Sequence, residues 1–376
     1  MQYRDLCGEQ VSALGFGCMR LPIIDDDARK IDEEKATRLL HHAYERGVNY
    51  FDTAWFYHGG ESEPLVGRAL ADIRDEVFIA TKLPPSEVES VDDCDRLLDQ
   101  QLERLQTDYV DFYLLHTLIG PTWDKLHGLG VLDWLERTLE DGRIDFAGFS
   151  FHDHTECFKR IIDAWNWDFC MIQYNYLDER SQAGAEGLHY AADRGIDVVV
   201  MEPLRGGALG RPLPDELEAE RRRLGIDWSP AQLGLRWVLD HREVSIALSG
   251  MNEMEHLQEN LAVAAETGPG SMTADERALV EAVRDHLRAN IKGDCTSCGY
   301  CLPCPEGVNI PRVFDMYNEM TISSPGRARF GYQKMTNPDE WASHCVECGI
   351  CEDKCPQNIP IVETLAEAHE ALTAEE

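Results

Sequence analysis

The feature that most constrains the fold is a regular alternation of short apolar runs with amphipathic runs over residues 1–285. Eight apolar runs have the length and composition of β-strands: Ala13–Cys18, Asn49–Thr53, Val77–Leu83, Val110–His116, Phe146–Phe151, Met171–Tyr174, Asp197–Met201 and Val244–Ser249. Runs with helical periodicity lie between them: Glu33–Glu45, Glu63–Ile73, Val91–Leu105, Val131–Leu139, Glu156–Trp165, Ala183–Arg194, Pro230–Leu239 and Glu253–Ala264. Eight such units in about 250 residues predict an α/β fold of the (β/α)8, or TIM-barrel, type. A doubly wound sheet is the alternative, but no G-x-G-x-x-G follows the first strand.

The cysteines predict a second domain over residues 286–376. Eight of the thirteen lie in two short runs: Cys295, Cys298, Cys301 and Cys304 in the first, and Cys345, Cys348, Cys351 and Cys355 in the second. The second run is C-x2-C-x2-C-x3-C-P, the bacterial ferredoxin-type signature of a [4Fe–4S] cluster, and the first is one residue shorter. Zinc is the alternative, but zinc sites usually use two separated pairs of ligands. We expect two [4Fe–4S] clusters.

The likeness to ferredoxins also implies how the ligands are shared. In two-cluster ferredoxins the fourth cysteine of each run ligates the other cluster. One cluster would then use Cys295, Cys298, Cys301 and Cys355, and the other Cys345, Cys348, Cys351 and Cys304. Between the runs, Pro311–Met320 has helical periodicity. This favours a small, mainly α-helical dicluster domain.

The charge balance argues against some partners. Asp and Glu number 69 against 35 Lys and Arg, which gives a formal net charge of −34. Such a surface repels phosphate backbones, so we expect no nucleic-acid partner. No run approaches the ~18–20 apolar residues of a membrane helix, and the first residues lack a signal-peptide pattern. Because exposed iron–sulfur clusters are sensitive to oxygen, the expected cofactor leads us to predict a cytoplasmic protein.

Four ionisable residues fall at or just after the ends of predicted strands, where barrel enzymes carry their chemistry. They are Asp52, Tyr57, Lys82 and His116. A buried Lys and Asp can lower the pKa of a neighbouring Tyr. That Tyr could protonate a carbonyl oxygen as hydride reaches the carbon, while a neutral His orients the carbonyl. The alternative is an ion pair at the barrel end and a structural histidine.

These residues resemble the catalytic tetrad of the aldo/keto reductase superfamily. Phe51–Tyr57 is similar to its D-x-A-x-x-Y motif, and Lys82 and His116 follow at the family's spacing. The resemblance implies that Tyr57 is the general acid and base. It also implies that Ser150 and Gln173 hold the nicotinamide amide, and that the segment from Gly250 to Asn260 lies on the adenosine side. The whole chain resembles the branch with two C-terminal [4Fe–4S] clusters.

The sequence departs from the family at three positions. Phe151 replaces the usual Asn, which removes one amide contact, and Met201 replaces the usual stacking aromatic. Glu253 stands where NADP-binding members place a cation, and a carboxylate better suits the ribose hydroxyl of NAD. Arg205 and Gly206 could contact the pyrophosphate, although a plain strand–helix turn explains them equally well.

The resemblance implies an NAD(P)-dependent oxidoreductase acting on a small carbonyl or alcohol substrate. Clusters move single electrons, whereas nicotinamide moves two as hydride. Three arrangements follow. In the first, hydride chemistry is coupled to the clusters, through a flavin such as FMN, and electrons pass to a partner protein. In the second, the clusters are structural or sense oxidation. In the third, the chain is a non-catalytic electron-transfer or redox-sensing protein.

Overall fold

The computed structural model describes residues 1–25, 27–293, 295, 301–322, 325–355 and 357–374. The chain forms two compact units: Met1–Gly210 with Ile226–Arg277, and Arg211–Gly225 with Ala278–Glu376. The units divide within α11 (Ala274–Asn290), the helix that also contains the sequence-based boundary at residue 285. The sequence analysis did not anticipate that the segment carrying α8 (Asp215–Arg223) belongs to the second unit.

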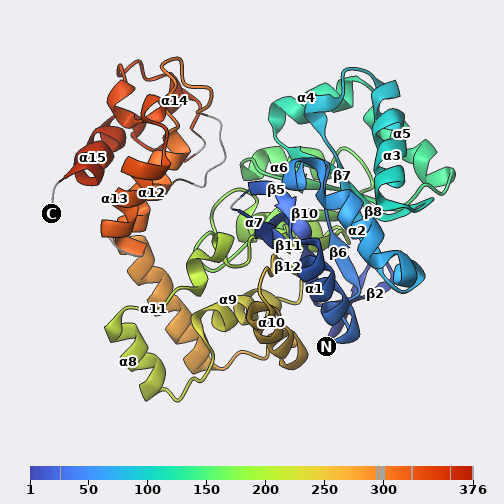
Figure 1. The fold of residues 1–376 in the computed structure, drawn as a ribbon, viewed down its shortest axis with the longest axis horizontal. Coiled ribbons are helices and arrows are strands. Elements are labelled where there is room, and N and C mark those ends of the chain that lie inside the picture. Colours follow the sequence, from blue (N-terminus) through green and yellow to red (C-terminus); the bar gives the residue numbers. More distant parts are fainter. Residues whose placement is uncertain (26, 294, 296–300, 323–324, 356, 375–376) are drawn as a thin grey trace. The chain divides into compact units, whose positions relative to one another are not determined.

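In the first unit, eight described strands form a closed barrel with parallel pairing between neighbours, as predicted (Figure 1). Each strand lies within two residues of its predicted bounds. In barrel order the strands are β10 (Phe169–Gln173), β11 (Asp197–Met201), β12 (Val244–Ser249), β3 (Leu14–Gly17), β6 (Tyr50–Asp52), β7 (Phe78–Leu83), β8 (Val110–Leu118) and β9 (Ile144–Phe151). Because all strands run in one direction, their carboxyl ends meet at one mouth.

Helices surround the strands (Figure 1). The eight that follow the predicted pattern are α1 (Glu33–Glu45), α2 (Ser62–Leu70), α3 (Val91–Leu105), α5 (Val131–Glu140), α6 (Thr155–Ile162), α7 (Gly184–Ala192), α9 (Pro230–Leu239) and α10 (Met254–Glu266). Their ends follow local chemistry. At α3, for example, the Asp93 carboxylate accepts the Ser90 backbone N–H at 2.9 Å in a capping box, and Leu97 and Leu98 are buried.

Two hairpins and one α-helix of the barrel unit were not predicted. They are a hairpin of β1 (Tyr3–Leu6) and β2 (Glu9–Ser12), a hairpin of β4 (Ile23–Ile24) and β5 (Asp27–Ile31), and α4 (Gly120–Gly128). The hairpin strands have five residues or fewer: β4 has only two, and the other three carry charged side chains, so they show little apolar alternation. The β4–β5 hairpin follows β3 and therefore starts from the mouth of the barrel.

The strands bury both faces. Alternate residues point into the barrel, where Tyr50, Phe112, Phe169 and Ile246 form one cluster. The others point outward against the helices in a separate, larger cluster. This double burial explains why the strands read as continuous apolar runs. It also leaves the barrel interior filled, so polar chemistry is confined to its ends.

The second unit is mainly helical, as predicted. Its other described helices are α12 (Ile310–Ile322), α13 (Pro325–Met335), α14 (Ile350–Asp353) and α15 (Ile361–Thr373). Val313, Phe314, Tyr332 and Leu365 are almost fully buried in a core of their own. Arg211, at the start of the inserted segment, pairs with Glu319 of α12.

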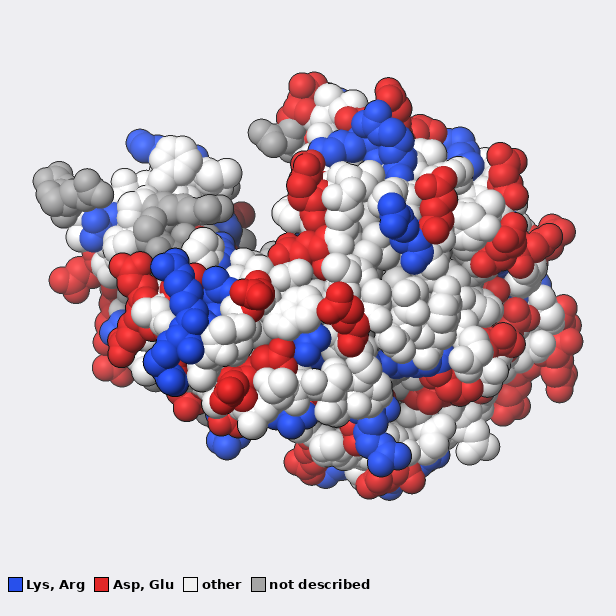
Figure 2. All heavy atoms as spheres, turned by 90° about the horizontal axis from the view of Figure 1, so that it is seen from below, with Lys and Arg blue, Asp and Glu red and all other residues white. Residues whose placement is uncertain are grey.

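On the face shown in Figure 2, Asp and Glu side chains are spread widely and gather most densely along the right-hand edge. The excess acidic charge is thus displayed at the surface on this face. Among the described residues, we find no helix with both the length and the apolarity needed to cross a bilayer.

Candidate active site and cluster-binding hollow

The four ionisable residues expected at the strand ends lie together at the carboxyl-end mouth of the barrel. Asp52 is the last residue of β6, Lys82 lies near the end of β7, and His116 lies in β8. Tyr57 begins the 3₁₀ turn that follows β6. Parallel pairing of β6, β7 and β8 places the three strand residues side by side.

Lys82 is the centre of this group. Its Nζ donates to Asp52 Oδ1 at 2.7 Å, to the Thr53 carbonyl at 2.7 Å and to the Tyr57 hydroxyl at 3.3 Å. Lys82 is 1% exposed and Asp52 3% exposed. An ammonium has three hydrogens, so these acceptors satisfy it fully. Breaking this buried pair would leave a charge uncompensated, so the arrangement is rigid.

Electrostatics keep Lys82 charged and His116 neutral. Burial alone would lower the pKa of Lys82, but contact with Asp52 and Tyr57 raises it above its ordinary value. Burial lowers the pKa of His116 well below its ordinary value, and the charges of Lys82 and His152 act in the same direction. The His116 ring meets the Tyr57 ring edge-on, with centroids 6.0 Å apart.

The expected effect on Tyr57 is wrong in its net direction. Burial raises the pKa of Tyr57 above its ordinary value, and the charge of Lys82 offsets only part of this. Asp52 adds to the increase, because a second negative charge nearby disfavours the phenolate. Tyr57 therefore keeps its proton at neutral pH, as a proton donor must.

His58 holds the loop that carries Tyr57. Its φ of 55° lies in the left-handed region, which is uncommon for a residue with a side chain. His58 Nδ1 lies 2.7 Å from the Ala28 carbonyl oxygen, and Nε2 accepts the Leu21 backbone N–H at 3.0 Å. Both ring nitrogens thus tie the Tyr57 loop to the chain on either side of β4.

Ser150 and Gln173, the predicted amide contacts, are buried and already bonded within the protein. Ser150 Oγ accepts the Thr117 backbone N–H at 2.7 Å. Gln173 Nε2 donates to Asp178 Oδ2 at 2.9 Å, and its Oε1 accepts from Gln182 Nε2 at 2.8 Å. Ser150 can still offer its hydroxyl hydrogen to a ligand. Gln173 would have to share or exchange its partners.

The two departures noted on the nicotinamide side have different consequences. Phe151 is fully buried outside the barrel, where its ring packs edge-on against Phe158 at 5.1 Å. It therefore offers no polar atom at the mouth. Met201 ends β11 and is partly exposed above the interior cluster. A thioether there can contact an aromatic ring.

The predicted adenosine-side residues fall into two groups. Gly250 is exposed after β12, whereas Asn260 is 4% exposed and donates to Ser249 Oγ at 3.0 Å. Asn260 thus ties α10 to the barrel. Glu253 directly precedes α10, and Lys35 Nζ lies 2.7 Å from each of its carboxylate oxygens. The pair fixes the Glu253 carboxylate and partly compensates its charge.

Arg205 and Gly206 begin a tight turn after β11. Gly206 and Gly207 have φ values of 64° and 95°. The Arg205 side chain turns inward, and its Nε lies 3.6 Å from Asp178 Oδ2. Arg20, which the sequence analysis did not select, lies against Gly206 instead.

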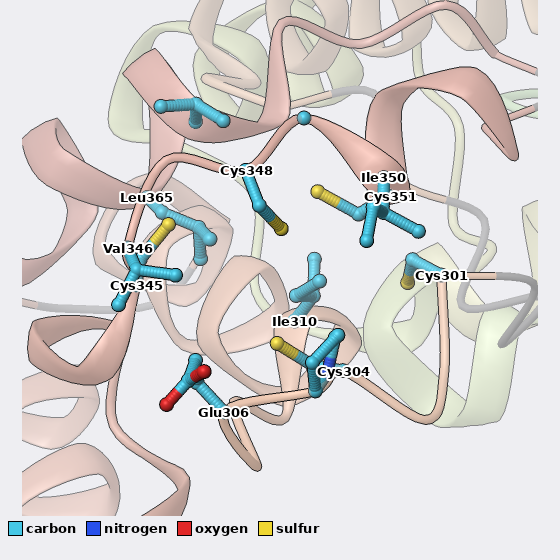
Figure 3. A pocket seen from close by; sticks show the side chains of 13 residues that line it. Cys301, Cys304, Glu306, Ile310, Cys345, Val346, Cys348, Ile350, Cys351 and Leu365 are labelled. Atoms are coloured by element: carbon cyan, nitrogen blue, oxygen red, sulfur yellow. The ribbon is translucent and has the colours of Figure 1, made fainter.

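Five cysteines line a hollow in the second unit (Figure 3): Cys301, Cys304, Cys345, Cys348 and Cys351. They come from two segments far apart in sequence. Four of them are the set that the ferredoxin-type pattern assigns to one cluster, with the fourth ligand taken from the other run. Thiolates are the ligands that [4Fe–4S] clusters use, so this donor set fits the group.

The other predicted ligands are less completely placed. Cys298 lies outside the described residues. Cys295 and Cys355 pack, partly buried, against the core of the second unit. Within the described part of the chain, no three His, Cys, Asp or Glu side chains form a group suited to one metal ion. A cubane takes one thiolate at each of four irons, so its ligands surround a volume instead of meeting at a point.

We compared the chain with models of known protein families. The model of the aldo/keto reductase family matches residues 13–274. The chain belongs to the aldo/keto reductase family. The model of the 4Fe-4S dicluster domain matches residues 294–359. The chain is therefore an oxidoreductase of the aldo/keto reductase type with a C-terminal dicluster domain.

Similar proteins cover mainly the barrel. L-galactose dehydrogenase of Arabidopsis thaliana is 25% identical over 306 residues, which is 75% of this chain and 93% of that protein. An NADP(+)-named aldo-keto reductase of Schizosaccharomyces pombe is 25% identical over 303 residues, 68% of this chain and 85% of that one. The holo form of an aldo-keto reductase from Bacillus halodurans is 30% identical, with a TM-score of 0.63 over 75% of this chain and 96% of its own.

In this aldo/keto reductase, sequence reasoning missed Arg20, His58 and Asp178 as parts of the mouth. Arg20 ends the 3₁₀ turn that follows the first barrel strand, and His58 directly follows Tyr57. Both residues lie shortly after the carboxyl end of a barrel strand, where the active sites of barrel enzymes form. This position in the sequence could have identified them. Asp178 gave no such signal, since its contacts with Gln173 and Arg205 depend on the fold of its loop.

Proposed function

We propose that the barrel interconverts a small carbonyl compound and its alcohol with a nicotinamide dinucleotide, with Tyr57 as general acid and base. The observation that carries this proposal is the contact of the buried Lys82–Asp52 pair with the Tyr57 hydroxyl at 3.3 Å. A solely structural ion pair has no need of a partly exposed phenol as a third member. The NADP(+)-named relative supports a nicotinamide cofactor.

The bound nicotinamide supplies or accepts the hydride. Tyr57 donates its proton to the carbonyl oxygen during reduction and takes it back from the alcohol during oxidation. Lys82 stabilises the phenolate left on Tyr57, because its charge lies at hydrogen-bond distance. Neutral His116 can donate a hydrogen bond that orients the same oxygen. Lys82 itself is held by Asp52 and so keeps its position throughout.

The direction of the Tyr57 pKa predicts the pH dependence of both reactions. Reduction needs the protonated phenol, and the Tyr57 pKa is raised. The reduction rate should therefore stay level from about pH 6 to 9 and fall only as pH rises through this pKa. Oxidation needs the phenolate, so its rate should increase over the same range. Steady-state kcat/KM in both directions tests this, with a decrease in reduction near neutral pH counting against Tyr57.

Glu253 predicts a preference for NADH. Its carboxylate repels a 2′-phosphate, and Lys35 holds it in place. Glu253→Gln should improve NADPH binding relative to NADH by about tenfold, or ~1.4 kcal/mol. Dissociation constants from quenching of protein fluorescence measure the ratio. Glu255→Gln, which changes an exposed carboxylate two residues later, should leave this ratio unaltered. An equal shift in Glu255→Gln would show that the effect comes from the overall charge and not from Glu253.

We further propose that the second unit carries two [4Fe–4S] clusters, one on Cys304, Cys345, Cys348 and Cys351, and the other on Cys295, Cys298, Cys301 and Cys355. Clusters transfer single electrons. Their coupling to hydride chemistry requires a converter such as FMN, and a redox-partner protein to receive the electrons. Iron, sulfide and flavin measured on one anaerobic sample test this, and iron without flavin would leave the clusters uncoupled from the barrel.

A second function is favoured by the nicotinamide side of the mouth. Gln173 has both ends of its amide bonded internally, and Phe151 offers no polar atom. A protein that only transfers or senses electrons would need neither contact. Saturable binding of NADH or NADPH to the anaerobic protein rejects this alternative, and absence of binding of both rejects the reductase.

A further inference from the structure

Arg20 lies beside two glycines at the mouth. It ends the 3₁₀ turn Cys18–Arg20 after β3. A Cβ added to Gly206 would lie 3.1 Å from Arg20 Nη2, and one added to Gly250 would lie 3.4 Å from Arg20 Cβ. Glycine at both positions thus gives the Arg20 side chain room between the loops that follow β11 and β12. These are the loops expected to face the dinucleotide.

Arg20 and Arg205 each pair with a carboxylate, but the Arg205–Asp178 pair is much more buried than the Arg20–Glu202 pair. The Arg205 side chain is 17% exposed and lies 3.6 Å from the Asp178 carboxylate, whose side chain is 2% exposed. Moving Arg205 away would remove a compensating charge from a buried carboxylate, which is costly. The Arg20 side chain is 48% exposed, and its ion pair with half-buried Glu202 is longer than a good hydrogen bond, at 3.5 Å. An exposed pair of this kind contributes little, so Arg20 can change partners.

The backbone that carries Arg20 is fixed on both sides. The Cys18 carbonyl accepts the Ser62 hydroxyl at 3.0 Å, and the Leu21 N–H donates to His58 at 3.0 Å. The base of the side chain is therefore held while its guanidinium remains accessible. The same His58 ring follows Tyr57 directly, so the Arg20 segment and the proton-donor loop share one support.

We propose that Arg20 binds the diphosphate bridge of the dinucleotide, and that Arg205 acts as a positioning residue for the nicotinamide end through Asp178 and Gln173. A guanidinium forms paired hydrogen bonds with phosphate oxygens, which a Lys cannot reproduce. Arg20 would therefore contact the diphosphate of the cofactor and not the carbonyl substrate. This inference rests on the proposed use of a nicotinamide dinucleotide.

The test compares NADH with ADP-ribose, which has the diphosphate but no nicotinamide. Both are titrated calorimetrically into the anaerobic full-length protein. Arg20→Gln should weaken both ligands by about 10- to 100-fold, as loss of charged hydrogen bonds predicts. Arg20→Lys should restore part of the loss. Arg205→Gln should weaken NADH and spare ADP-ribose. Arg29→Gln, an exposed cation on β5, should leave both affinities unchanged.

Each contrary result has a distinct meaning. Wild-type affinity of Arg20→Gln for ADP-ribose would overturn the assignment of Arg20 alone. A loss of ADP-ribose binding in Arg205→Gln as large as in Arg20→Gln would return the diphosphate to Arg205. If the wild-type protein binds neither ligand, the proposed function fails and the inference with it. Circular dichroism and melting of each variant show whether the fold is retained.

Discussion

Replacing Tyr57 with Phe should reduce the rate of carbonyl reduction by about 10²–10⁴-fold, the contribution typical of a positioned general acid. The change removes one oxygen and keeps the ring that packs edge-on against His116. Lys82 keeps its bonds to Asp52 and to the Thr53 carbonyl, so the buried pair remains compensated. The loss should therefore appear in kcat, with little change in NADH affinity.

The control is Tyr44→Phe, which removes a hydroxyl bonded to Glu76 on the protein surface. It should leave turnover and iron content unchanged. Iron should also remain in Tyr57→Phe, because the second unit has a hydrophobic core of its own. Near wild-type reduction by Tyr57→Phe would remove Tyr57 from the chemistry. Loss of iron together with activity would show that the change acts through the fold.

The barrel was predictable because its signal is local and repeated. Strands buried on both faces become apolar runs, and helices keep their own period, so all eight units could be located. The β4–β5 hairpin and the α8 segment carry mainly charged residues, and their places depend on contacts distant in sequence. Nothing in their own composition indicates where they pack.

The candidate site was predictable in position but not in its electrostatics. Strand ends brought Asp52, Lys82 and His116 together as expected. The Tyr57 pKa was expected to fall, because the Lys82 charge can be inferred from sequence while the extent of burial cannot. Arg205 was likewise predicted to contact the diphosphate, because its charge and its place after a strand can be read from the sequence. Its buried partner Asp178 becomes visible only in the folded loop.

The ligand sharing between the two cysteine runs can be tested by combining substitutions. Cys348→Ala and Cys304→Ala should each remove about half of the iron, since each removes one ligand of one cluster. If both belong to the same cluster, the double variant should lose no more than either single one. If each run instead holds its own cluster, the double variant should lose nearly all iron.

Cys301→Ala with Cys348→Ala is the matched control, because these residues belong to different clusters under either scheme. This pair should lose nearly all iron, which shows that a double loss is detectable. Cys18→Ala, buried at the barrel mouth, should keep full iron content. Half the iron in the Cys304–Cys348 pair and almost none in the Cys301–Cys348 pair would establish that the runs exchange their fourth ligands. Under such an exchange each cluster has ligands from both runs, so iron would connect the two segments and stabilise the second unit.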